Sequence, residues 1–347
     1  MKVTFRWYGD RDPVRLSDIR QIPAVTGVVT AVYDVPVGEV WTRERIRRLK
    51  GEVSAAGLAV SVVESLPVHE EIKLGRPTRD RYIANYMASL AHLGAEQIPV
   101  VTYNFMALFD WMRTDLEHRL PDGSTSLAYD GQSFERLSIR EAAAVLRRLP
   151  GWDPSYSVEE AERLLEEYRE LGHAGLTENL AYFLRAVGPA AKDAGIRLAI
   201  HPDDPPWDVW GLPRIVTGAE DLARLLSFYD HPSNGLCVCI GSLGASPGND
   251  VVAIMRRFAA EGRVHFAHLR NIVHDGPRQF HESGHRDGDL NLAAVVRVLN
   301  EAGYTGPVRP DHGRRIWDED GHGGYGLYDR ALGAMYLAGL YDGLTKS

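Results

Sequence analysis

Cysteine is nearly absent from this chain of 347 residues, which contains only Cys237 and Cys239. A disulfide between two residues that close on one strand would be strained, so a disulfide-stabilised secreted fold is excluded. No run of about 18 apolar residues occurs either, which excludes a transmembrane helix of the usual kind. The first residues, Met1 to Arg6, lack the basic, apolar and small-residue regions of a signal peptide. We therefore expect a cytoplasmic protein.

Concentrated positive charge is also missing. The 39 Lys and Arg residues against 47 Asp and Glu give a net charge of −8, and no basic block offsets it locally. The most basic tract, Arg43 to Arg48, is typical of a solvated helix face. We therefore expect neither nucleic acid nor an anionic membrane as a partner. The hydrophobic fraction of 44% is ordinary for a globular chain.

Short β-rich runs alternate with longer helical patterns along the chain. The eight predicted strands are residues 3–8, 28–33, 59–65, 98–104, 197–201, 236–240, 264–270 and 307–311. Eight strands alternating with helices predict an α/β fold, a single (β/α)8 TIM barrel over residues 1–347. A doubly wound sheet is the alternative, but the turn at Gly9 to Pro13 lacks the G-x-G-x-x-G pattern of dinucleotide-binding folds.

One predicted connection, residues 105–157 between the fourth and fifth strands, is much longer than the others. It contains an aromatic run from Phe105 to Trp111 and a turn at Pro121 to Gly123. Long segments of this kind inside a compact domain commonly serve as lids or binding loops. We expect this one to be a lid or interface insertion, and the protein to be a homo-oligomer.

Potential metal ligands stand at the ends of four consecutive predicted strands, where the active site of such a barrel lies. They are His201, Cys239, His268 and Asp311. Alternation along each strand directs these side chains inwards and their large aliphatic neighbours towards the helices. Two imidazoles, a thiolate and a carboxylate make a complete set of ligands for a divalent metal. On this chemistry alone Mn, Fe, Co and Zn stay open.

Other polar residues adjoin these strand ends. His312 follows Asp311 directly, and Tyr325 lies in the glycine-rich segment Gly321 to Gly326, so both are candidates for proton transfer. Arginine suits a substrate carboxylate because its planar fork contacts both oxygens. The residues expected to bind the carboxylate and hydroxyls of a substrate are Arg6, Tyr8, Asn104, Arg270 and Arg309.

Residues His281 to His285 fit the H-E-x-x-H pattern of metalloproteases, in which both histidines bind zinc from one face of a helix. Gly284 and the polar run Arg286 to Asp289 favour a loop after the seventh strand instead. We therefore reject a protease. We expect either polar residues of a substrate loop or structural hydrogen bonding within that loop.

The chain resembles the mannonate dehydratase family along nearly its whole length. The segments that carry the resemblance are Phe5–Gly9, Pro36–Trp41, Val63–Glu70, Tyr103–Met106, Trp111–Leu116, His201–Pro206, Gly211–Arg214, Phe266–Arg270, Phe280–Glu282, Arg309–Gly313 and Gly324–Arg330. The resemblance implies a barrel related to xylose isomerase, a Mn²⁺ or Fe²⁺ ion, and dehydration of the sugar acid D-mannonate to 2-keto-3-deoxy-D-gluconate. The family's metal positions match His201, Cys239, His268 and Asp311. Its proposed catalytic pair matches His312 and Tyr325, without deciding which is the base and which the acid.

Two other functions compete with this one. A metal-dependent sugar isomerase or epimerase could use the same barrel, but such sites use carboxylates and histidines, so Cys239 argues against it. A non-catalytic sugar-acid-binding paralogue would be expected to have lost a metal ligand or the His312–Tyr325 pair, and this chain has lost neither.

Overall fold

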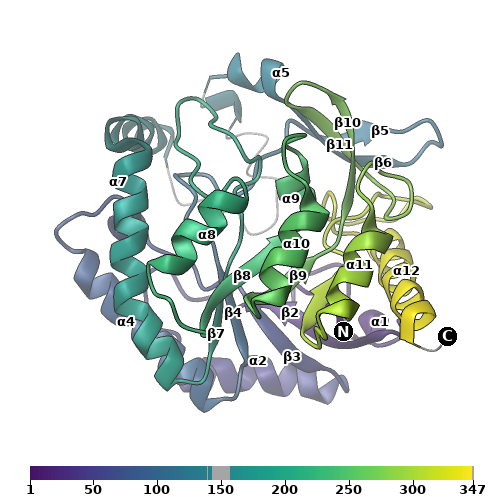
Figure 1. Cartoon of the computed structure of the whole chain (residues 1–347), viewed down its shortest axis with the longest axis horizontal. Coiled ribbons are helices and arrows are strands. Elements are labelled where there is room, and N and C mark those ends of the chain that lie inside the picture. Colours follow the sequence, from purple (N-terminus) through teal and green to yellow (C-terminus); the bar gives the residue numbers. More distant parts are fainter. Residues whose placement is uncertain (139, 143–156, 346–347) are drawn as a thin grey trace.

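The computed structural model describes residues 1–138, 140–142 and 157–345. Eight parallel strands close into a barrel in the order β1-β12-β9-β8-β7-β4-β3-β2 (Figure 1). These strands are β1 (Lys2–Arg6), β2 (Val25–Thr30), β3 (Ala59–Glu64), β4 (Val100–Tyr103), β7 (Arg197–Ile200), β8 (Asn234–Cys239), β9 (Val264–His268) and β12 (Pro307–Arg309). Each overlaps one of the strands predicted from the sequence, so the (β/α)8 fold is confirmed.

Helices surround the barrel and cover its outer face (Figure 1). Local sequence sets where they begin: Thr42 accepts a hydrogen bond from Arg45 N at the start of α2, and Ser157 with Glu160 forms a capping box at the start of α7. A non-helical Gly172 with φ 61° kinks α7. The helices are α1 (Leu16–Ile19), α2 (Arg43–Ala55), α3 (Glu70–Lys73), α4 (Arg79–Ala95), α5 (Gly131–Glu135), α7 (Val158–Asp193), α8 (Ala219–Ser227), α9 (Ile240–Gly244), α10 (Val251–Ala260), α11 (Leu292–Glu301) and α12 (Tyr328–Thr345).

A second, antiparallel sheet of four strands lies beside the barrel in the order β10-β11-β6-β5. Its strands are β5 (Asp115–Arg119), β6 (Thr125–Asp130), β10 (Asn271–Gly276) and β11 (Gln279–Ser283). The described part of the predicted 105–157 insertion supplies β5 and β6, while residues 139 and 143–156 of it lie outside the described residues. β11 pairs with β6 through Phe280 and Tyr129. The sheet therefore joins the insertion to the connection that follows β9.

This second sheet corrects one prediction. His281, Glu282 and Ser283 were expected in a loop, but they form the end of β11 and pair with β10. The loop prediction is wrong there because the segment folds back on β10 as an antiparallel hairpin, and β6, which is distant in sequence, pairs with the first part of β11. The alternative of a zinc-binding helix is also wrong, because this segment is a strand.

The barrel interior is filled by side chains that alternate along the strands. Six inward-facing residues form an apolar cluster of their own: Val29, Val62, Val100, Ala199, Cys237 and Phe266. Intervening residues such as Val28, Leu198 and Val238 belong to the larger core shared with the helices. This is the alternation expected of a filled barrel, and it means that residues two positions further along each strand also face the axis.

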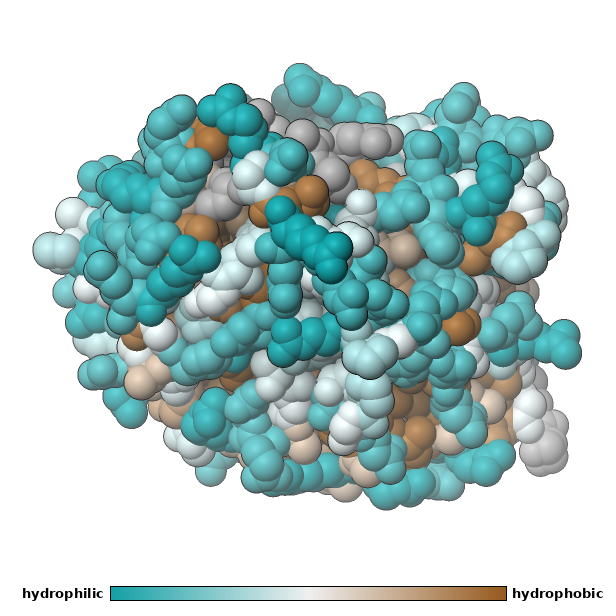
Figure 2. All heavy atoms as spheres, turned by 90° about the horizontal axis from the view of Figure 1, so that it is seen from above, coloured by the Kyte–Doolittle hydropathy of each residue, from teal (hydrophilic) through white to brown (hydrophobic). Residues whose placement is uncertain are grey.

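The surface seen in Figure 2 is mostly hydrophilic, and hydrophobic residues appear on it in small groups. Among the described residues, the most exposed large hydrophobic residue is Trp317, with 70% of its surface accessible, followed by Leu332 of α12 with 48%. Among the helices that the structure describes, none has both the length and the apolar composition needed to cross a bilayer.

Candidate active site

The four predicted metal ligands meet at the carboxyl end of the barrel. His201 directly follows β7, and Cys239 and His268 are the last residues of β8 and β9. Asp311 was predicted to end its strand, but β12 ends at Arg309. The strand stops there because Pro310 has no N–H for the sheet, and Asp311 then adopts a left-handed φ of 66°.

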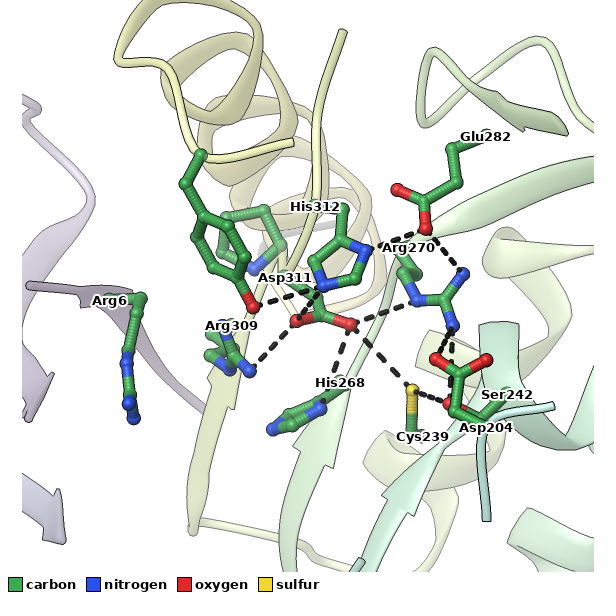
Figure 3. A network of polar contacts seen from close by, with 12 residues as sticks. Arg6, Asp204, Cys239, Ser242, His268, Arg270, Glu282, Arg309, Asp311 and His312 are labelled. Carbon is green, nitrogen blue, oxygen red and sulfur yellow. Dashed lines mark hydrogen bonds and ion pairs between the residues drawn. The ribbon is translucent and has the colours of Figure 1, made fainter. Parts of the chain in front are cut away.

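Three of these residues, Cys239, His268 and Asp311, place one potential ligand atom each within 4.8 Å of one another. Asp311 Oδ2 lies 3.7 Å from His268 Nδ1 and 3.7 Å from Cys239 Sγ (Figure 3). His201 Nε2 lies 3.2 Å from the same His268 nitrogen. His201, the fourth predicted ligand, therefore lies next to this group of three and is in contact with its member His268.

The hydrogen bonds around the two imidazoles test whether a cation fits between them. His201 Nδ1 lies 2.6 Å from the carbonyl oxygen of Pro202, and His268 Nε2 lies 3.1 Å from Glu64 Oε1. These acceptors hold the ring protons on the outer nitrogens, so the lone pairs of His201 Nε2 and His268 Nδ1 face each other. A cation between them removes the repulsion, and a carboxylate behind a ligating histidine is a common support at metal sites. The residues present thus fit a divalent metal.

A second possible ligand group contains two of the four predicted ligands, His201 and His268, together with Glu64 and Cys237. Two features weigh against it. Burial raises the pKa of the Cys237 thiol well above its ordinary value, which disfavours the thiolate that binds a metal. Glu64 is already paired, because its Oε2 lies 3.1 Å from Arg309 and 3.3 Å from Arg6. We therefore favour Cys239 over Cys237.

Glu64 is a site residue that the sequence prediction missed. Burial by itself would raise the pKa of its carboxyl, but Arg309 and His268 outweigh burial and lower it, so the group is ionised. The signal was present, because Glu64 lies next to the end of the predicted strand 59–65, on the inward-facing side, just as His201, Cys239 and His268 lie at or near the ends of theirs.

His312 and Tyr325 form a hydrogen-bonded pair above the ligand group. His312 Nε2 lies 3.0 Å from the Tyr325 hydroxyl, and His312 Nδ1 lies 2.6 Å from Glu282 Oε1. Burial raises the pKa of Tyr325 to about 12 although Arg309 opposes it, so the phenol is protonated at neutral pH. Burial would also raise the pKa of Glu282, but His312, Arg270 and Arg113 lower it overall. Glu282 therefore presents a carboxylate that holds a proton on His312 Nδ1.

A buried ion-pair network supports this pair from below (Figure 3). Arg113 donates to Asp204 and Glu282 at 2.9 and 2.6 Å, and its side chain is fully buried. Arg270 contacts the same two carboxylates at 2.9 and 3.2 Å, and Asp311 Oδ2 at 3.0 Å. The second sheet thus reaches the site, because Glu282 comes from β11. Sequence spacing offered no signal for Arg113 or Asp204, which lie in loops.

The site opens into a cavity of about 640 Å³. The predicted residues that line it are Arg6, Tyr8, Asn104, His201, Arg309, Asp311, His312 and Tyr325. Arg309 Nε and Nη1 and Arg6 Nε are buried and have no hydrogen-bond partner among the described residues. Arg270 is absent from the described lining and is occupied by three carboxylates. The geometry thus favours Arg6 and Arg309 over Arg270 for a substrate anion.

The other two predicted binding residues in the cavity wall are Tyr8 and Asn104. Tyr8 stands edge-on to Tyr325, with ring centroids 5.0 Å apart, and the Arg6 guanidinium lies 4.6 Å from its ring centre. Burial raises the pKa of Tyr8 well above its usual value, so it is a neutral hydroxyl at the cavity wall. Asn104 follows β4 and lines the same cavity.

Comparison with known proteins gives one consistent result. The family described as D-mannonate dehydratase (UxuA) matches residues 1–347. A mannonate dehydratase of Streptococcus agalactiae serotype III (strain NEM316) is 51% identical, over 100% of this chain and 99% of the relative. "Mannonate dehydratase 2" of Halalkalibacterium halodurans is 49% identical over the full length of both chains.

Solved structures agree. The crystal structure of mannonate dehydratase from Streptococcus suis serotype 2 superposes with a TM-score of 0.92 at 47% identity, covering 100% of this chain and 95% of that one. D-psicose 3-epimerase from Clostridium cellulolyticum H10 superposes with a TM-score of 0.56 at 12% identity, covering 100% and 97%, which shows a shared fold alone. From its full-length match and its close relatives, the chain belongs to the D-mannonate dehydratase family.

Proposed function

We propose that this protein is a metal-dependent hydro-lyase that converts D-mannonate to 2-keto-3-deoxy-D-gluconate. The observation that carries the proposal is the placement of the His312–Tyr325 pair beside Asp311, in a cavity lined by two arginines with unpaired donors. Family membership supplies the substrate class. The site supplies groups for each chemical task.

Substrate binding begins with the carboxylate. Arg309 is fixed by Glu64 at 3.1 Å and by Asp311 at 2.8 Å, while its Nε and Nη1 have no hydrogen-bond partner among the described residues and can donate to a ligand. Arg6 is held by the same Glu64 carboxylate. A planar guanidinium contacts both carboxylate oxygens, so this arrangement orients C1 and the C2 proton next to it.

His312 is the proposed base. Because Glu282 holds a proton on Nδ1, the Nε2 lone pair is free to take the C2 proton once substrate displaces the Tyr325 hydroxyl from it. The C2–H electron pair then forms a C1–C2 double bond, and negative charge develops on the carboxylate oxygens. Glu282 stabilises the imidazolium that results.

Tyr325 is the proposed acid. Its pKa of about 12 means that it holds its proton at neutral pH. It gives that proton to the C3 hydroxyl, which leaves as water while a C2–C3 double bond forms. The enol then loses the proton of its C2 hydroxyl and takes a proton at C3, which gives the 2-keto acid, and His312 returns its proton through solvent to restore the tyrosine.

His201, Cys239, His268 and Asp311 are the residues that would hold the metal. A divalent ion such as Mn²⁺ or Fe²⁺ supplies Lewis-acid stabilisation of negative charge on the substrate carboxylate. Glu64 and Pro202 orient the two imidazoles. Ser242 donates to Cys239 Sγ at 3.0 Å, which suits a thiolate.

The test is incubation of the purified protein with D-mannonate and Mn²⁺, followed by NMR of the products. We expect loss of one water and accumulation of 2-keto-3-deoxy-D-gluconate. An isomer or epimer of the substrate formed without loss of water would replace this proposal by the isomerase alternative. Binding of D-mannonate with no product would favour a non-catalytic paralogue.

We also propose a homo-oligomer in the cytoplasm. The exposed side chains of Trp317, Tyr328, Leu332 and Met335 support association, since α12 presents the last three on one side. Light scattering of the purified protein tests this: a single species of 38.6 kDa would contradict it.

A further inference from the structure

A buried ion pair lies in the wall of the active-site cavity, apart from the ligand group. α3 is a single turn in which Glu70 and Lys73 stand on the same side, and Lys73 Nζ donates to Glu70 Oε1 at 2.8 Å. Their side chains are 6% and 9% exposed for Lys73 and Glu70 respectively. Both residues line the cavity. The reaction proposed above gives neither of them a role.

Among the strands that carry the proposed metal ligands, the barrel order places β9 opposite the strand that precedes this pair. Those ligands come from β7, β8, β9 and the segment after β12, which occupy one arc of the ring. α3 follows β3, which is four strands away from β9 in either direction around the ring. A chain-like substrate that starts at Arg309 and His312 therefore extends towards Lys73.

Lys73 has hydrogen-bonding capacity that the described residues do not use. An ammonium group has three N–H donors, and within the described part of the chain the hydrogen bonds of Nζ go to Glu70 alone. The other oxygen of Glu70 accepts a hydrogen bond from the Tyr168 hydroxyl, so Glu70 is held at both oxygens. Burying a charged pair is costly unless its remaining donors are also satisfied. Since Lys73 lines the cavity, a ligand bound there can satisfy its remaining donors.

We propose that Lys73 binds the terminal C6 hydroxyl of an extended sugar acid, and that Glu70 and Tyr168 are positioning residues for it. This inference rests on the proposed function and deepens it. Because Glu70 neutralises Lys73, the pair suits an uncharged hydroxyl better than a second carboxylate. The subsite therefore selects a six-carbon aldonate over a shorter one.

The test uses a double variant, Glu70→Gln with Lys73→Met, which removes both charges and keeps the side-chain volumes. A single Lys73 change would leave Glu70 buried and unpaired, which destabilises a fold. Thermal unfolding of the double variant confirms that it is folded. Lys192→Met, an exposed lysine on α7 outside the cavity lining, is the matched control.

Two substrates separate a subsite from a structural role. D-mannonate has a C6 hydroxyl. D-lyxonate has the same configuration at C2, C3 and C4 but one carbon fewer, so it lacks that hydroxyl. We expect the double variant to raise the KM for D-mannonate about tenfold or more, the effect of losing a charged hydrogen bond, with a smaller change in kcat. For D-lyxonate we expect kcat/KM to match that of the wild type and of Lys192→Met.

An equal loss of kcat/KM with both acids would overturn the subsite and leave the pair structural. The wild type could also bind mannarate, the six-carbon dicarboxylate, more tightly than D-mannonate. If the double variant loses that preference, the proposal is overturned and the pair is an anion site instead. If the wild type converts no aldonate, the proposed function fails. The subsite is still tested in that case, because calorimetric Kd values for the two acids must then show the same selective tenfold loss.

Discussion

Two layers of the barrel interior differ in chemistry although the same six strands carry them. The lower layer is apolar: Val29, Val62, Val100, Ala199, Cys237 and Phe266. The upper layer lies two residues further along each strand: Ala31, Glu64, Thr102, His201, Cys239 and His268. Two residues are one repeat of strand alternation, so both layers face the axis, about 7 Å apart.

The difference shows how one fold separates stability from function. The lower layer contributes through burial of apolar surface. The upper layer carries ionised groups and the proposed metal ligands, and its charged groups are tolerated there because they are paired, as Glu64 is with Arg309 and His268. A step of two residues along a strand therefore separates side chains whose loss should lower the free energy of unfolding from side chains whose loss should lower catalytic activity.

The two cysteines test this division most sharply, because they occupy the same strand in adjacent layers. Cys239→Ser should lower metal affinity by about 100-fold or more and abolish activity, since it removes a proposed ligand. Cys237→Ser should keep the metal. Elemental analysis of the two purified variants measures the difference, and equal metal contents would contradict the assignment.

The catalytic pair should respond almost as strongly. Tyr325→Phe removes one oxygen, so kcat should fall about 100-fold or more while metal content stays unchanged. His312→Asn should do the same and should also stop exchange of the C2 proton with deuterated solvent. If Tyr325→Phe blocks that exchange and His312→Asn permits it, the roles of base and acid are reversed.

The next largest effect should come from removing the arginines that are proposed to bind the substrate carboxylate. Arg309→Ala and Arg6→Ala should each reduce kcat/KM for D-mannonate by about 2 kcal/mol, the scale of a charged hydrogen bond. Lysine at either position should restore activity only in part, because the fork is lost. Steady-state kinetics with unchanged values in both alanine variants would move carboxylate recognition to another residue.

Glu64 and Val62 repeat the layer comparison on β3. Glu64→Gln should weaken metal binding at least about tenfold, because the support of His268 is lost. Val62→Ala should leave metal binding unchanged and lower the free energy of unfolding by about 1–3 kcal/mol through the cavity it creates. Metal titration and urea unfolding of both variants provide the readouts, and a reversed pattern would contradict the division into layers.

The smallest predicted effect concerns His265, which β9 turns away from the barrel axis. Burial lowers its pKa to about 4 from an ordinary 6.5, so the folded protein binds fewer protons there than the unfolded chain between these values. Its contribution to stability is full above pH 6.5 and is lost as the pH falls towards 4. His265→Gln should flatten the dependence of unfolding free energy on pH in that window. An unchanged slope would show that other groups account for it.

The sequence allowed the barrel and its ligand layer to be predicted because both depend on local alternation. His201, Cys239 and His268 stand where strands end, and Glu64 could have been found by the same rule. The second sheet could not be predicted in this way. Its central pairing joins Tyr129 to Phe280, and nothing local to either segment indicates the partner.

The same long-range pairing explains why the sequence did not indicate the residue that supports His312, the proposed base. Glu282 lies in a pattern typical of zinc proteases, and it becomes a site residue only because β11 carries it to His312. Arg113 and Asp204 lie in loops whose side chains meet in space without any periodic spacing. Arg270 illustrates the opposite problem, since its strand-end position indicates a substrate contact while the structure pairs it with Asp204, Glu282 and Asp311.

The central claim is that the upper layer of the barrel, and not the lower one, holds the metal. X-ray absorption at the metal edge of manganese-loaded wild type, Cys237→Ser and Cys239→Ser tests this most directly. We predict one sulfur ligand in the wild type and in Cys237→Ser, and none in Cys239→Ser. A sulfur ligand that persists in Cys239→Ser and disappears in Cys237→Ser would contradict the account.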